Sequence, residues 1–292
     1  PLVIGIGGGL NQTLVTAGLQ LILDGHRYLC SSNQPFKNPL GAALDILGMR
    51  NRNKQYSWWH ILTRSRLQEL TAAEPDTIAV ELGPKKPGDI DQVAQWFKFN
   101  IGLVTGVPTT RLDLFGDHAM VAHEILSLIV SLQTTATALL NSDDPVVATM
   151  RGKTAARVLT FGRGPTADLR LKHVQRQGTG FSGAVTFQQQ SAELYLPFLA
   201  TTEQVTAVLG ALALTIPLKL NLALAANRLS RLLPPPGHSR LLAGKEGSRL
   251  LDGSADTCPE EAFAGLDALR ELPARRRIAV LGDITGLSAQ SR

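Results

Sequence analysis

The chain opens with an apolar segment, a glycine-rich turn and an apolar helical segment. Residues 2–6 are apolar, Gly7, Gly8 and Gly9 form the turn, and the helical pattern begins near Thr13. This order presents backbone N–H groups and a helix N-terminus to a phosphate group, as nucleotide-binding loops do. A tight strand-to-helix turn explains the same glycines without any ligand, so both interpretations stay open.

The turn lacks the lysine that nucleotide loops place beside the β- and γ-phosphates. Thr13 supplies the hydroxyl expected on Mg²⁺, but the residue before it is Gln12, which carries no charge. An amide donates a hydrogen bond without neutralising the phosphates, and charge-assisted hydrogen bonds are roughly twice as strong as neutral ones. The sequence therefore predicts the architecture of an ATP site with damaged chemistry.

Short apolar segments alternate with helical patterns over the first half of the chain. Strands are expected at residues 77–81, 101–105 and 137–141, with helices at 89–97 and 120–132. Strands separated by helices predict an α/β fold with a mostly parallel sheet and helices on both faces. Ligands of such folds bind beyond the carboxyl ends of the strands.

Several polar residues follow these strands, so we expect them at one rim of the sheet. Glu81 is a candidate Mg²⁺ ligand together with Thr13, or else a solvated rim residue. Asn141 and Asp144 are candidates for holding the adenine and ribose side of a nucleotide. They are equally typical of an Asx turn with an N-cap for the next helix.

The second half of the chain changes its pattern. Apolar and polar residues alternate between 169 and 198, which predicts a small antiparallel sheet. Helices are expected at 202–214 and 218–232. The three prolines of Pro234–Gly237 then cannot continue a helix and predict a linker.

Beyond the linker the pattern returns to strand, helix and strand. A strand is expected at 248–252, a helix at 259–272 and a strand at 277–282, which together predict a partial Rossmann-like domain. The predicted domains are residues 1–233 and 234–292. Because the chain starts on one strand and stops after another, we expect it to be a piece of a longer protein.

The composition excludes several classes of protein. The net charge is a mild +5 and aromatic residues make up 5%, so the chain offers no stacking platform for nucleic acid. The longest apolar stretch, Gly210–Ala226, is interrupted by Pro217 and Lys219, which predicts buried helices rather than a membrane span. Cys30 and Cys258 lie far apart and read as free thiols of the cytoplasm.

These segments resemble the Mur ligase family, most closely its D-alanyl-D-alanine-adding branch. The resemblance is carried by the order and spacing of Ala79–Gly83, Pro87–Ile90, Leu140–Pro145, Arg157–Gly162, Ala167–Asp168, Gly247–Asp252 and Ile278–Asp283. It implies a central ATP-binding domain followed by the start of a C-terminal domain. It also implies ATP-driven joining of an amino acid or peptide to a UDP-muramoyl precursor.

The family's chemical positions are partly replaced. Asn11 stands for a glycine, Gln12 for the loop lysine, Arg111 for a histidine and Ala122 for a lysine near the metal, while Glu81 is retained. The resemblance assigns nucleotide contacts to Gly8, Asn11, Gln12, Thr13, Asn141 and Asp144, metal contacts to Thr13 and Glu81, and the altered catalytic positions to Gln12 and Arg111.

Two hypotheses about function follow. The first is a Mur-ligase-like protein of cell-wall precursor metabolism that is catalytically impaired or acts as a non-catalytic binding or scaffold homologue. The alternative is an active ATP-dependent amide ligase in which Arg111 or another cation replaces the lysine. ATP and Mg²⁺ are the cofactors of an active protein, and none is needed by an inactive one. The implied partners are a nucleotide or UDP-linked precursor and a protein of cell-wall synthesis.

Overall fold

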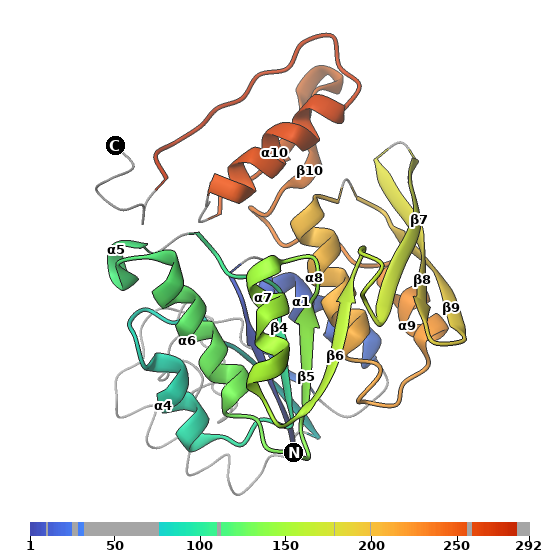
Figure 1. The fold of residues 1–292 in the computed structure, drawn as a ribbon. Coiled ribbons are helices and arrows are strands. Elements are labelled where there is room, and N and C mark those ends of the chain that lie inside the picture. The colour runs from blue at the N-terminus through green and yellow to red at the C-terminus, as the bar shows by residue number, and fades with distance from the viewer. Residues whose placement is uncertain are drawn as a thin grey trace, which may run out of the picture.

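A computed structural model describes residues 1–9, 11–24, 29–31, 76–109, 112–177, 179–198, 200–255 and 259–284. Arg111, Cys258 and the adjacent tryptophans, Trp58 and Trp59, lie outside these ranges. Within them, the largest element is a 9-stranded sheet in the order β2-β3-β1-β4-β5-β6-β7-β8-β9 (Figure 1).

The first part of this sheet is parallel, as predicted. Its strands are β2 (Leu29–Ser31), β3 (Thr77–Glu81), β1 (Leu2–Gly7), β4 (Ile101–Val104), β5 (Thr137–Asn141) and β6 (Arg157–Gly162). The antiparallel strands are β7 (Leu169–Gln177), β8 (Gly180–Phe187) and β9 (Gln190–Leu196). They continue the same sheet because Phe161 and Gly162 of β6 pair in parallel with the start of β7.

Helices cover both faces of the sheet, which confirms the predicted fold class. One face carries α1 (Gln12–Ile22), α8 (Thr202–Ala213) and α9 (Leu222–Leu229). The other carries α4 (Asp89–Trp96), α6 (His118–Val130) and α7 (Pro145–Thr149). The short α5 (Leu112–Phe115) precedes α6, and the 3-10 turn η1 (Met150–Lys153) follows α7.

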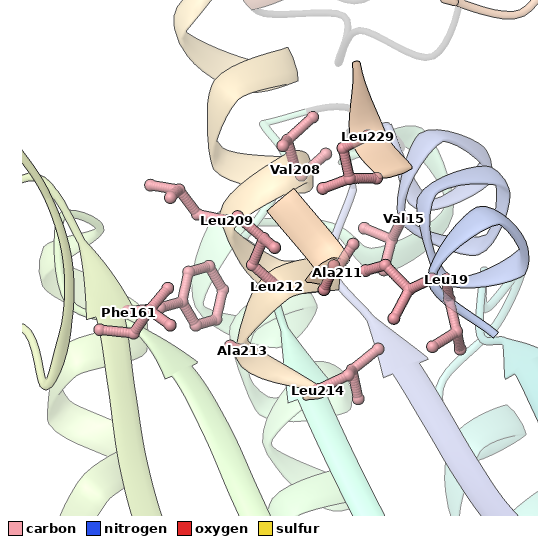
Figure 2. Packing of buried hydrophobic residues seen from close by; sticks show 14 of the residues in the cluster. Val15, Leu19, Phe161, Val208, Leu209, Ala211, Leu212, Ala213, Leu214 and Leu229 are labelled. Carbon is pink, nitrogen blue, oxygen red and sulfur yellow. The ribbon is translucent and has the colours of Figure 1, made fainter. Parts of the chain in front are cut away.

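Small residues let the helices approach the sheet and each other. In Figure 2, Val15 and Leu19 of α1 lie beside Ala211 and Leu212 of α8. A Cβ on Gly18 of α1 would stand 3.0 Å from the Ala211 Cβ, so the two helices are already in close contact. This packing fixes the position of α1, and with it the glycine loop that precedes α1.

Two expected elements differ in the structure. The helix expected from residue 218 begins only at Leu222, because Lys219 is left-handed (φ 54°) and the Asn221 side chain caps the helix at Leu224 N. The strand expected at 277–282 is wrong: these residues join no ladder, and Val280 is 92% exposed. A strand needs a partner for its backbone groups, and the described part of the chain places none beside this segment.

The region after the linker forms a small unit. Strands β10 (Arg240–Ala243) and β11 (Arg249–Asp252) pair antiparallel around the 3-10 turn η2 (Lys245–Gly247), and α10 (Pro259–Glu271) follows. Figure 1 shows α10 lying beyond the carboxyl ends of the parallel strands. The domain boundary at residue 234 stays a prediction. No helix within the described ranges is long and apolar enough to cross a bilayer.

Candidate functional site

The glycine loop after β1 requires its glycines. Gly8 has φ +113°, and a Cβ there would stand 2.5 Å from the Thr105 hydroxyl oxygen. A Cβ on Gly9 would overlap the ring of Pro108. Asn11 is also left-handed, with φ 58°. Asparagine is among the non-glycine residues that tolerate this conformation best, so Asn11 allows this backbone turn without a glycine.

The N-terminus of α1 directly follows the glycine loop. The Asn11 side chain makes no capping hydrogen bond, and the first turn holds no acidic residue. The first N–H groups of a helix have no partner within the helix and carry partial positive charge. An anion at this point would therefore be stabilised by backbone N–H groups and by the helix dipole.

Gln12 is buried in the loop and holds it to the neighbouring strand. Its Nε2 donates to the carbonyl oxygens of Gly8 and of Leu82, the latter at 2.9 Å. Its Oε1 is buried and has no hydrogen-bond partner among the residues that the structure describes. The amide donor at the lysine position is thus engaged by the protein's own backbone.

Thr13 and Glu81 meet where the sequence predicts a metal site. The Thr13 hydroxyl donates to Glu81 Oε2 at 3.3 Å, and the Thr16 hydroxyl donates to Glu81 Oε1 at 2.8 Å. Glu81 is buried at the end of β3, while Thr13 is half-buried. Mg²⁺ is commonly held by one or two protein oxygens together with waters and phosphates, and this pair fits that requirement.

A metal site formed by protein side chains alone is not found in the described residues. The described residues contain no cluster of three or more histidine, cysteine, aspartate or glutamate side chains that would hold an ion. The Thr13 and Glu81 pair is therefore the candidate that the geometry supports, and waters or a ligand's oxygens would complete the coordination sphere.

Asn141 connects the ends of two strands. Its Nδ2 donates to the Thr105 carbonyl oxygen at 2.8 Å, and its Oδ1 accepts from Asp143 N at 3.0 Å. The second contact is the Asx turn expected from the sequence. The predicted rim is thus present in the structure. Residues at the carboxyl ends of β1, β3, β4 and β5 lie in contact with residues of the adjoining loops and helices.

Asp144 links α7 to the loop after β4. Its Oδ1 accepts from Val146 N and Val147 N, which makes it the N-cap of α7, and its Oδ2 accepts from Val107 N at 3.0 Å. Both carboxylate oxygens are therefore bonded to backbone. These contacts support the interpretation of Asn141 and Asp144 as an Asx turn and an N-cap. Their role toward a nucleotide stays a prediction.

Other polar residues of the rim were not predicted. Glu124 of α6 is buried and accepts from Gly88 N and Ile90 N, each at 2.7 Å, so it orders the turn before α4. Thr16 was also missed, although its position three residues after Thr13 on an amphipathic helix was a usable signal. Arg111 falls outside the described residues, so its predicted role stays a prediction.

The C-terminal unit reaches this rim through the loop after β4. The Thr109 hydroxyl donates to Glu260 Oε1 at the start of α10, and the neighbouring Pro108 packs on Gly9. A second contact joins Arg176 of β7 to Glu271 of α10 at 2.7 Å. The loop after β4 therefore contacts both the glycine loop and α10.

Comparison with known protein families identifies the family of this chain. Residues 34–215 match the Mur ligase middle domain. The chain belongs to the Mur ligase family. The match begins after the glycine loop, which lies outside the matched residues.

Curated relatives carry the name UDP-N-acetylmuramoyl-tripeptide–D-alanyl-D-alanine ligase. The Mycobacterium tuberculosis protein is 26% identical over 256 residues, covering 85% of this chain and 48% of the relative. The Synechocystis protein is 30% identical over 207 residues, covering 71% of this chain and 43% of the relative. The chain thus spans about half the length of the curated Mur ligases it matches.

Solved Mur ligase structures share the fold. MurF from Acinetobacter baumannii superposes with a TM-score of 0.83 at 18% identity, over 99% of this chain and 58% of that one. MurF from Thermotoga maritima, solved in complex with ADP, superposes with a TM-score of 0.72 at 19% identity, over 93% of this chain and 57% of that one. The predicted architecture is confirmed by these likenesses.

Proposed function

We propose that this chain is a Mur-ligase-like protein of cell-wall precursor metabolism in which ATP-driven ligation is impaired. The observation that carries the proposal is Gln12, a buried neutral amide at the lysine position whose donor bonds the Gly8 and Leu82 carbonyls. Such a protein would act as a binding or scaffold homologue. Its ligands would be a nucleotide or UDP-linked precursor, and its partner a protein of cell-wall synthesis in the cytoplasm.

The missing charge is the physical reason. Phosphoryl transfer is accelerated mainly by positioning and by electrostatic stabilisation of the transferring group. Removing one transition-state donor from other enzymes costs about 3 kcal/mol, and a lysine contributes a full charge as well as a donor. Gln12 cannot supply that charge, and within the described residues no hydrogen bond brings a lysine or arginine side chain to the loop.

The residues that would hold ATP and Mg²⁺ can be named from their positions. The N–H groups of Gly8, Asn11, Gln12 and Thr13 would face the phosphates, and Thr13 and Glu81 would hold Mg²⁺. Bound there, Mg²⁺ would neutralise phosphate charge. These residues match the ligands in donor type, but without the lysine charge we expect them to bind Mg-ATP only weakly.

An active ATP-dependent amide ligase is the alternative. Asn11 keeps the left-handed turn of the loop, and the Thr13–Glu81 pair is intact. A cation supplied by Arg111 or by another residue would then replace the lysine. The two functions differ in one property: whether a cation reaches the phosphates above the loop.

A coupled assay separates them. The protein is incubated with Mg-ATP, a UDP-muramoyl peptide and D-alanyl-D-alanine, and phosphate release is measured together with amide formation. We expect no coupled turnover, either in the wild type or in Gln12→Lys, because residues that act as a unit are not restored one at a time. Coupled turnover in the wild type would establish the alternative, and coupled turnover in Gln12→Lys alone would show that the lysine is the single defect.

A further inference from the structure

One face of α1 contacts the end of β3 at three points. Gln12 donates to the Leu82 carbonyl oxygen, while Thr13 and Thr16 each donate to one oxygen of the Glu81 carboxylate. Residues 12 and 16 are four apart on a helix and therefore lie on the same side of it. The helix thus holds both the backbone after Glu81 and the Glu81 side chain.

We propose that Thr16 is a positioning residue for Glu81. Its hydroxyl fixes Oε1, so that Oε2 stays beside the Thr13 hydroxyl as a pair of oxygen ligands for a divalent cation. The inference rests on the proposed role of Thr13 and Glu81 as the metal pair and adds the residue that orients it.

The hydrogen bonds that Glu81 accepts from Thr16 and from Thr13 differ in length. The Thr16 bond measures 2.8 Å, the normal length for a hydroxyl donor, whereas the Thr13 bond measures 3.3 Å, longer than usual. Thr16 therefore holds the carboxylate firmly, and the Thr13 contact is loose. A loose pair of oxygens can separate around an ion without losing the rotamer that Thr16 fixes.

Thr16 has a competing partner in its own helix. Its hydroxyl oxygen also stands 3.0 Å from the Thr13 carbonyl oxygen, the usual partner of a helical threonine. A hydroxyl has one proton, and a carboxylate accepts a stronger hydrogen bond than a neutral carbonyl does. The shorter distance to Glu81 agrees with that preference.

Burial makes Thr16 difficult to replace. Thr16 is 1% exposed and Glu81 is 2% exposed, so bulk water does not reach the hydrogen bond between them. Removing the hydroxyl would take away the 2.8 Å hydrogen bond that Thr16 donates to Glu81 Oε1. Residues that orient metal ligands in other proteins change metal affinity by about 10- to 100-fold when they are mutated.

The test uses Mn²⁺ as the probe and four variants of the full chain. Mn²⁺ binding is measured by electron paramagnetic resonance for the wild type, Thr16→Val, Thr16→Ser and Glu81→Gln. The fourth variant, Thr215→Val, is a matched control, because Thr215 is equally buried and donates to the Leu212 carbonyl with no carboxylate involved. Crystal structures of Thr16→Val and Thr16→Ser report the Glu81 rotamer independently of the metal.

We expect Thr16→Val to weaken Mn²⁺ binding about tenfold and to release the Glu81 rotamer, with Thr16→Ser and Thr215→Val close to the wild type. If Thr16→Val keeps both the affinity and the rotamer while Glu81→Gln loses binding, the role of Thr16 is wrong and the metal pair stands. If Glu81→Gln binds Mn²⁺ like the wild type, or the wild type does not bind, the metal pair fails and Thr16 has no ligand to position.

Discussion

At the scale of single residues, the two substitutions in the glycine loop act differently. Asn11 adopts the left-handed conformation and so maintains the shape of the loop. Gln12 keeps a hydrogen-bond donor at the lysine position but removes the charge, and its donor bonds the backbone. Under the proposed function, the loop therefore keeps its shape while the charge of the lysine is lost.

Asp144 should contribute to stability more than an ordinary cap. Asp144→Ala removes the N-cap of α7 and also the acceptor for Val107 N. We expect a loss of about 1–2 kcal/mol in the free energy of unfolding for the cap alone, with a further loss for Val107, measured by urea denaturation. Asp117→Ala, which removes only the N-cap of α6 at Met120 N, is the control. Equal losses in the two variants would show that the Val107 contact adds nothing.

At the scale of elements, glycines set how closely helices approach the sheet. A Cβ on Gly5 of β1 would stand 2.7 Å from Leu128 Cδ1 of α6 and 3.0 Å from Phe99. Both neighbours are buried side chains, so neither can move into solvent. Gly5 is therefore needed for packing against α6 and Phe99, whereas Gly8 and Gly9 serve the turn that follows.

Gly5→Ala should lower stability through overpacking. Added methyl groups in tight cores cost about 1–3 kcal/mol, and we expect a loss in that range by urea denaturation. Gly152→Ala is the matched control, because a Cβ there meets nothing within 4 Å. A neutral result for Gly5→Ala would mean that α6 can shift, and the close packing described above would be overstated.

The sequence predicted elements well where local pattern and tertiary contacts agree. The bounds of β3 and β5 were predicted residue for residue, because buried apolar runs between turns determine them. The segment at 277–282 has the same apolar pattern but stays exposed, since pairing depends on a neighbouring strand. In the site, strand ends predicted Glu81 and Asn141, whereas the Gln12–Leu82 and Thr16–Glu81 contacts join residues distant in sequence and required the structure.

At the scale of the whole molecule, polar contacts tie the C-terminal unit to the sheet. Gln204 of α8 donates to the His238 carbonyl oxygen at 2.8 Å, Thr109 donates to Glu260, and Arg176 pairs with Glu271. Exposed ion pairs contribute little to stability, about 0–1 kcal/mol each. An interface of this kind suits a unit that changes its orientation when a ligand binds.

The linker should loosen in acid. Hydrogen bonds from Ser254, and then from Gly237 N, hold the pKa of Asp252 below its ordinary value of 3.8. A lowered folded-state pKa means that this stabilisation is present above pH 3.8 and is lost as the pH falls through the folded-state pKa.

Hydrogen exchange of residues 237–255, followed as the pH is lowered, checks this prediction. We expect faster exchange once Asp252 is protonated, and Asp252→Asn should show the faster exchange already at neutral pH. If the wild type and Asp252→Asn show the same protection at every pH, the Asp252 carboxylate does not stabilise this region.

Calorimetric titration of the chain with Mg-ATP at moderate salt tests the central claim most directly. Without a cation at the Gln12 position, we expect no binding tighter than a dissociation constant of about 1 mM, which corresponds to a free energy near −4 kcal/mol. The isolated Gln12→Lys variant should bind more tightly than the wild type without regaining ligation. Micromolar binding by the wild type would contradict the account, because it would require a cation at the phosphates that the loop itself does not supply.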